Sequence, residues 1–317
     1  MTVEALWITG PCRAERRASA LGEGIAVDTL FTAISRGTER LVFEGRVPVS
    51  EYQRMRAPAQ EGEFPYPVKY GYCAVGCVSE GNLAGRDVFA LHPHQTRFRM
   101  AEAMLTPLPE GLPPERAILG ANMETALNVL WDSMAGAGDR IVVIGAGVVG
   151  ALVAYLASRL PGTDVTLIDV NPARAALAEA FGCGFAAPSG APGDCDVAIH
   201  SSASEQGLAL ALESVGRDAT VVEASWYGAG STPAPLGGAF HSRRLRLVGS
   251  QVGQVPPMRA PRWSHARRMT KALDLLRDPV LDILISGETE FEELPERYEG
   301  ILTDPETLCH RIRYQPN

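Results

Sequence analysis

A glycine-rich turn between an apolar strand and an apolar helix constrains this chain more than any other feature of its sequence. Residues 140–144 end in four consecutive β-branched residues and predict a buried strand, and residues 148–160 predict a helix. Gly145, Gly147 and Gly150 lie at the junction. A strand, a tight glycine turn and a helix in this order predict the first βαβ unit of a Rossmann domain.

The three glycines and the amides that follow them have the chemistry of a pyrophosphate site. Gly145 permits the tight turn, Gly147 lets the backbone approach the phosphates, and Gly150 allows the helix to pack closely on the strand. The main-chain N–H groups of Val148 and Val149, at the positive end of the helix, then face the anion. The sequence therefore predicts that this domain binds a dinucleotide.

Asp169 ends the next predicted strand, about 20 residues beyond the glycines. A carboxylate there accepts hydrogen bonds from the ribose hydroxyls of adenosine and repels the 2′-phosphate of NADP. The following residues 170–172 bring no arginine, and Arg174 lies about one helical turn further on. We therefore expect NAD(H), with NADP(H) as the less favoured cofactor. A Rossmann-like domain that binds another nucleotide, or none, is the alternative.

The rest of the chain divides by pattern into two domains. The first 115 residues alternate short apolar segments with Gly and Pro, which favours strands and loops, and residues 107–114 are dense in helix and strand breakers. Beyond them a predicted helix over residues 115–134 is followed by strands that alternate with helices, which indicates a parallel sheet. The chain is expected to end in a strand–helix–strand tail over residues 283–314. We expect an α/β chain in which residues 117–255 form a doubly wound Rossmann domain. Residues 1–116 and 256–317 are expected to form a β-rich substrate domain.

The net charge and the distribution of apolar residues limit which kinds of partner this chain is expected to bind. The formal net charge is −8, which gives no electrostatic reason to bind nucleic acid or an anionic membrane. No stretch supplies the roughly 20 apolar residues of a membrane helix, and the first residues do not read as a signal peptide. The 6 cysteines form no CxxC pair, which fits free thiols in a reducing compartment. We expect a cytoplasmic protein that acts on a small molecule.

The domain order and several segments resemble the medium-chain dehydrogenase/reductase superfamily over nearly the whole chain. The similar segments are residues 34–39, 71–76, 119–126 and 291–298. The Ser-x-Gly-Thr-Glu sequence at 35–39, followed by residues 44–48, is similar to the bacteriochlorophyllide dehydrogenase branch, although its pigment substrate is not carried over. The resemblance implies a GroES-like β-rich catalytic domain together with the Rossmann domain. It also implies a homodimer that pairs through a strand within residues 245–252.

The zinc ligands of the superfamily are missing from this sequence. Where zinc-dependent members place cysteine, histidine and a third cysteine, the resemblance places Arg36, Tyr72 and Ala121. Arginine does not lose its proton to become a ligand, and alanine has no donor atom. No cysteine lies between Cys77 and Cys183, so the structural-zinc segment is missing as well. We therefore expect no zinc.

Without a metal, side chains must protonate or stabilise the substrate oxygen. The resemblance places five candidates around the nicotinamide. Tyr72 is expected to donate its phenol proton, and His94 to act as an acid or base. Glu124 is expected to be a carboxylate with a shifted pKa. Thr38 is expected to donate a hydroxyl hydrogen bond, and Arg36 to anchor the substrate.

Each candidate also fits a structural role. Tyr72 fits the edge of the core, His94 a loop or a hydrogen-bonded core position, and Glu124 a salt bridge. His92, two residues before His94, invites the same two interpretations. Arg36 fits a buried ion pair with Glu39 or with Glu124, and Thr38 fits the start of a helix.

Two further hydroxyls are expected beside the cofactor. They belong to Thr125 and to Ser201, which follows a predicted strand that ends at residue 200. The sequence as a whole predicts a zinc-independent, NAD(H)-dependent oxidoreductase for an alcohol or carbonyl substrate. One alternative is an enoyl or quinone reductase; such enzymes commonly use NADPH, so Asp169 argues against it. The other is a nucleotide-binding protein of the same fold without catalysis.

Overall fold

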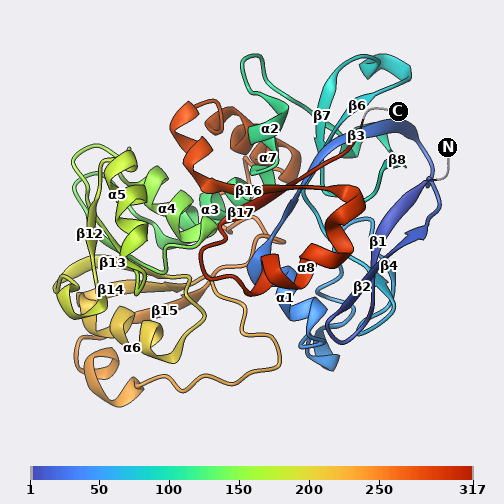
Figure 1. Ribbon diagram of the computed structural model, residues 1–317. Coiled ribbons are helices and arrows are strands. Elements are labelled where there is room, and N and C mark those ends of the chain that lie inside the picture. Colours follow the sequence, from blue (N-terminus) through green and yellow to red (C-terminus); the bar gives the residue numbers. More distant parts are fainter. Residues whose placement is uncertain (1–2, 316–317) are drawn as a thin grey trace. The chain divides into compact units, whose positions relative to one another are not determined.

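The computed structural model describes residues 3–315 and divides into two compact units (Figure 1). The first unit comprises Met1–Ala121 and Ala266–Asn317, and the second comprises Asn122–His265. The second unit contains a parallel sheet, and the first unit is rich in β-strands that form two further sheets. The predicted α/β fold class is therefore confirmed.

The second unit is built on a six-stranded parallel sheet with the order β12-β11-β10-β13-β14-β15. Numbered from β10, this order is 3-2-1-4-5-6, that of the doubly wound dinucleotide-binding fold. The strands are β10 (Arg140–Ile144), β11 (Asp164–Ile168), β12 (Gly184–Ala186), β13 (Cys195–His200), β14 (Val215–Glu223) and β15 (Arg246–Gly249).

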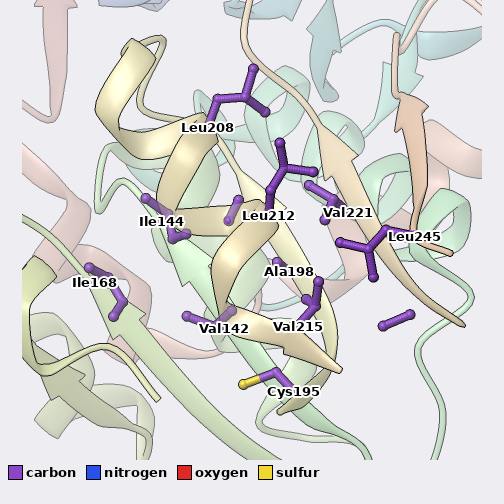
Figure 2. Close-up of a cluster of buried hydrophobic side chains, with 12 residues drawn as sticks. Val142, Ile144, Ile168, Cys195, Ala198, Leu208, Leu212, Val215, Val221 and Leu245 are labelled. Atoms are coloured by element: carbon purple, nitrogen blue, oxygen red, sulfur yellow. The ribbon is translucent and has the colours of Figure 1, made fainter. Parts of the chain in front are cut away.

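Helices cover both faces of this sheet. Figure 1 shows α4 (Val148–Ala157) and α5 (Ala175–Phe181) on one side and α6 (Glu205–Ser214) on the other. Parallel strands covered on both faces are apolar along most of their length, as β10 is. The buried cluster under α6 joins helix and strand side chains, among them Leu208, Leu212, Val142, Ala198 and Val221 (Figure 2).

The first unit contains two sheets. A seven-stranded sheet has the order β16-β17-β3-β6-β7-β9, with β8 paired to β3, and a four-stranded sheet has the order β2-β1-β5-β4. The strands are β1 (Glu4–Gly10), β2 (Arg13–Ala18), β3 (Ile25–Ile34), β4 (Glu61–Gly62), β5 (Val68–Lys69), β6 (Ala74–Val78), β7 (Asp87–Ala90), β8 (Arg97–Met100), β9 (Thr106–Pro107), β16 (Ile285–Glu290) and β17 (Cys309–Arg313).

The remaining helices are α1 (Arg36–Phe43), α2 (Pro114–Ala117), α3 (Gly120–Ser133), α7 (His265–Leu275) and α8 (Leu294–Thr303). The expected strand–helix–strand tail is confirmed by β16, α8 and β17. Among residues 3–315, no helix combines the length and the apolar character needed to cross a bilayer.

Two local expectations were wrong. Residues 36–43 form α1 rather than strand or loop, because eight residues are too few to show a helical period in the sequence. The helix expected over residues 115–134 is split into α2 and α3. The second part starts at Gly120, a weak helix former, where an added Cβ would lie 2.8 Å from the ring of Phe89.

Candidate functional site

The glycine turn after β10 is closely packed at two positions and open at the third. Gly145 has a φ of +103°, and a Cβ added there would lie 2.8 Å from the backbone nitrogen of Ser202. A Cβ at Gly150 would lie 1.9 Å from the carbonyl oxygen of Gly145. A Cβ at Gly147 would meet no heavy atom within 4 Å. Packing therefore requires the first and third glycines, whereas the second faces open space that a phosphate can approach.

Main-chain amides at the start of α4 complete this turn. Gly147 is the N-cap residue and Val148 begins the helix, so the N–H groups of Val148 and Val149 lack acceptors within the helix. The hydroxyl of Ser201 donates to the carbonyl oxygen of Gly145 at 3.0 Å and holds the turn. Ser201 therefore lies at the predicted dinucleotide site.

Asp169 follows β11 and turns back toward the glycine turn. Its Oδ2 accepts a hydrogen bond from the backbone N–H of Ala146 at 2.7 Å, and its Oδ1 accepts one from Asn171 at 2.8 Å. Each carboxylate oxygen keeps a further lone pair for a ligand hydroxyl. A fixed carboxylate, open space at Gly147 and unpaired helix amides together fit a dinucleotide.

In the first unit, Tyr72 and Thr38 come together around a serine that the sequence analysis did not single out. The Tyr72 hydroxyl donates to Ser35 Oγ at 2.6 Å and also hydrogen-bonds with Thr38. Ser35 is the N-cap residue of α1, but its side chain makes no capping hydrogen bond, so its hydroxyl can accept from Tyr72. Burial raises the pKa of Tyr72, so the phenol keeps its proton at neutral pH.

His94 belongs to a buried network centred on Glu39. His94 Nε2 lies 3.0 Å from Glu39 Oε2, which also accepts from the Tyr298 hydroxyl at 2.6 Å. The other carboxylate oxygen accepts from the backbone N–H of Ser35 at 2.7 Å. On the far side of the ring, His94 Nδ1 lies 2.7 Å from Thr32 Oγ1. Glu39 appeared in the sequence analysis merely as a possible partner of Arg36, and nothing local to it indicated this network.

The remaining predicted residues are more dispersed. The guanidinium of Arg36 donates to the carbonyl oxygen of Asp304 at 3.1 Å. Glu124 is buried and Thr125 is half-buried, and both lie on α3. The structure therefore places Arg36, Thr38, Tyr72 and His94 in the first unit, and Glu124 and Thr125 in the second with the glycine turn.

The three positions that the resemblance aligns with zinc ligands do not fit zinc. Arg36, Tyr72 and Ala121 offer no thiolate, imidazole or carboxylate, which are the protein ligands that zinc takes. Across residues 3–315, no group of three or more His, Cys, Asp or Glu side chains is arranged to hold a metal ion.

Comparison with solved structures identifies the fold. L-idonate 5-dehydrogenase from Escherichia coli K-12 matches with a TM-score of 0.79 and 13% sequence identity, over 99% of this chain and 98% of that one. A putative zinc-binding dehydrogenase from Sinorhizobium meliloti, bound to NADP, matches with a TM-score of 0.78 and 18% identity, over 99% of both chains. The chain has the fold of the medium-chain dehydrogenases. The predicted resemblance is thereby confirmed at the level of the fold.

Sequence comparison also finds distant relatives. D-guloside 3-dehydrogenase from Escherichia coli K12 is 25% identical over 209 residues, which span 61% of this chain and 59% of that protein. No family model matches this chain.

Proposed function

We propose that this medium-chain dehydrogenase fold carries a zinc-independent, NAD(H)-dependent oxidoreductase for a small alcohol or carbonyl substrate. The observation that carries the proposal is the carboxylate of Asp169, fixed 2.7 Å from the Ala146 amide beside the open turn at Gly147. The dehydrogenase names of its structural and sequence relatives support the same class of reaction.

The preference for NAD(H) rests on charge. A carboxylate that lies beside the adenosine ribose can accept hydrogen bonds from both ribose hydroxyls, and it repels a 2′-phosphate. The Sinorhizobium meliloti structure holds NADP, so the fold by itself does not exclude that nucleotide. Both nucleotides therefore have to be compared on this chain.

We assign the cofactor to the second unit and the handling of substrate oxygen to the first. The bound nicotinamide supplies the hydride acceptor or donor. Tyr72 keeps its proton, which turns from Ser35 Oγ to the substrate oxygen when substrate binds, and Ser35 then donates its own hydroxyl proton to the phenol oxygen while Thr38 helps to orient the ring. In this scheme these groups take the place of a Lewis acid.

The other candidates receive narrower roles. His94 is 1% exposed, so it acts as a positioning residue through Glu39. Arg36 is partly exposed at the start of α1 and is assigned as an anchor for an anionic substrate group. Glu124 is a second candidate proton donor, and Thr125 a cofactor contact on the same helix.

Fluorescence titration tests the cofactor assignment. The native chain is expected to bind NADH at least about tenfold more tightly than NADPH, and Asp169→Ser is expected to lose most of that difference. An Asp164→Ser variant is the matched control, because that exposed carboxylate lies at the other end of β11. Absence of saturable binding to either nucleotide would overturn the proposal.

Metal analysis of the purified chain tests zinc independence. We expect substoichiometric zinc and no loss of turnover after dialysis against a chelator. One tightly bound zinc per chain that is required for turnover would overturn zinc independence, while the assignment of the cofactor would still hold.

We also propose a homodimer that forms through β15. This strand is the last in the sheet order, and Leu247 on it is 39% exposed. An edge strand with an exposed apolar side chain favours pairing with a second copy. Light scattering should give twice the chain mass, and Leu247→Lys should reduce it toward the mass of one chain.

A further inference from the structure

A histidine and a glutamate end two neighbouring strands of the parallel sheet. His200 is the last residue of β13 and Glu223 the last of β14, and the two are paired in register. His200 Nδ1 lies 2.7 Å from Glu223 Oε2, while His200 Nε2 lies 2.7 Å from the hydroxyl of Ser202. The imidazole is fully buried and Ser202 is exposed. The register of the sheet therefore produces a Ser–His–Glu arrangement at its carboxyl edge.

The hydrogen bonds assign the protons of this arrangement. A carboxylate is an acceptor, so His200 Nδ1–H donates to Glu223 and Nε2 accepts from the Ser202 hydroxyl. Glu223 also accepts from the Tyr227 hydroxyl at 2.9 Å and from the Ser225 backbone N–H at 2.8 Å. Burial favours the neutral acid, but hydrogen bonds from His200 and Ser225 outweigh it and lower the pKa of Glu223. The carboxylate therefore stays charged and holds the imidazole in the tautomer that accepts a proton from serine.

The surrounding backbone leaves room for this contact. Gly207 lies in α6, and a Cβ added there would lie 2.3 Å from Ser202 Oγ and 2.6 Å from His200 Nε2. Ala203 has a φ of +53°, an uncommon conformation for a residue with a side chain, and it turns the chain directly after Ser202. The hydroxyl of Ser204 lies 2.8 Å from that of Ser202 and can donate to it. The segment thus presents the serine oxygen to solvent while the serine hydroxyl proton is hydrogen-bonded to the imidazole.

We propose that Ser202 is an activated nucleophile, with His200 as its general base and Glu223 as the orienting carboxylate. The chain then has a second, cofactor-independent activity toward activated esters. Arrangements of this kind are recognised by geometry and roles rather than by fold or residue order. The proposal is separate from the redox function, because no step in it needs a dinucleotide.

The reaction is an ordinary acyl transfer to water. Ser202 Oγ bonds to the carbonyl carbon of the ester as its proton passes to His200 Nε2. The carbon–oxygen bond to the leaving alcohol breaks, and the departing oxygen keeps the electron pair and takes the proton from the imidazolium. Water then attacks the acyl carbon and gives a proton to His200, which returns it to Ser202 as the acid leaves. The positive end of α6, which begins at Glu205, favours the negative charge that develops on the carbonyl oxygen.

Covalent labelling of the full chain without nucleotide tests the proposal. The chain is incubated with a fluorophosphonate probe, and adducts are located by peptide mass spectrometry. We expect Ser202 to be labelled at least about tenfold faster than Ser204, its matched neighbour in the same segment. p-Nitrophenyl acetate should be hydrolysed with an initial burst, which Ser202→Ala abolishes and Ser189→Ala, at an exposed serine of the same unit, leaves in place.

A variant of Glu223 shows whether Ser202 is labelled because it is activated or merely because it is exposed. Glu223→Gln keeps the shape of the side chain but removes its charge, and it should slow labelling about tenfold or more at neutral pH. Equal labelling of Ser202 and Ser204, or an unchanged rate in a folded Glu223→Gln variant, would overturn the proposal. Circular dichroism and NADH titration verify that each variant is folded, so that failure of the redox function is detected separately.

Discussion

His94 Nε2 and Glu39 Oε2 lie 3.0 Å apart, and neither side chain is more than 1% exposed. The hydroxyl of Tyr298, on α8, donates to the same carboxylate oxygen across a sequence separation of 259 residues. Burying a carboxylate costs free energy of folding unless its oxygens are hydrogen-bonded. The Glu39 carboxylate is hydrogen-bonded by Ser35 and His94 from the N-terminal part of the unit and by Tyr298 from the C-terminal part. The network therefore helps to hold the C-terminal segment onto the N-terminal part of the first unit.

Removing the tyrosine hydroxyl tests this interpretation. Tyr298→Phe should lower the free energy of unfolding by about 1–3 kcal/mol, because a buried carboxylate oxygen loses a short hydrogen bond. Urea unfolding of native and variant chains measures the difference. Tyr52→Phe is the control, since Tyr52 is half-buried and packs against Phe64 through its ring. Equal losses in the two variants would show that the network contributes no special stability.

The stability of the chain should depend on pH through His92. Burial lowers the pKa of His92 to about 3, and its ring stacks on Phe98 with centroids 3.9 Å apart. Below about pH 6.5 the His92 imidazole binds a proton in the unfolded chain but stays neutral in the folded chain. The free energy of unfolding therefore falls as the pH decreases toward 3. The expected contribution is at most about 1.4 kcal/mol per pH unit in that window.

Replacing the histidine should remove this part of the pH dependence. Chemical unfolding of His92→Gln at several pH values should give a smaller slope between about pH 6.5 and 4 than that of the native chain. A native slope retained in His92→Gln would mean that other groups cause the acid sensitivity.

Two glycines of the turn should separate binding from stability. A Cβ at Gly147 meets open space and its φ is −70°, so Gly147→Ala should leave the melting temperature nearly unchanged. The added methyl group occupies the expected pyrophosphate space and should weaken NADH binding about tenfold or more. Thermal melting and NADH titration of the same samples measure both effects. An unchanged NADH affinity would place the phosphates elsewhere.

Gly150→Ala should behave in the opposite way. Its Cβ would lie 1.9 Å from the Gly145 carbonyl oxygen, so the strand and helix must move apart. We expect destabilisation of about 1–3 kcal/mol even without nucleotide. A native-like melting temperature for Gly150→Ala would contradict the packing role of this glycine.

The Rossmann unit could be predicted because its signals are local. The strand that ends at Ile144, the three glycines and Asp169 all lie within one βαβ unit, and spacing alone defines their roles. Glu223 and His200 could also have been paired, since each ends a neighbouring parallel strand, but their register was needed to show the contact.

The hydrogen-bond networks of the first unit could not be predicted in the same way. Glu39 takes its partners from His94, 55 residues away, and from Tyr298, 259 residues away. No periodic pattern encodes such separations, because they depend on how the sheets close. Tyr72 and Thr38 were identified through the family resemblance, whereas Ser35 between them became evident from geometry alone.

Tyr72→Phe is the sharpest test of the proposed chemistry. Burial raises the pKa of Tyr72, so the phenol remains a donor across the neutral range and its loss should lower kcat by about 10²- to 10⁴-fold. NADH affinity should stay the same, because the glycine turn and Asp169 lie in the other unit. Steady-state kinetics and NADH titration are measured on the same preparations. Tyr66→Phe, which removes a hydroxyl bonded to the Phe43 carbonyl oxygen, controls for general loss of a phenol. Native turnover in Tyr72→Phe would mean that Glu124, not Tyr72, is the proton donor. A native chain that binds NADH but turns over no alcohol or carbonyl substrate would support a nucleotide-binding role without catalysis.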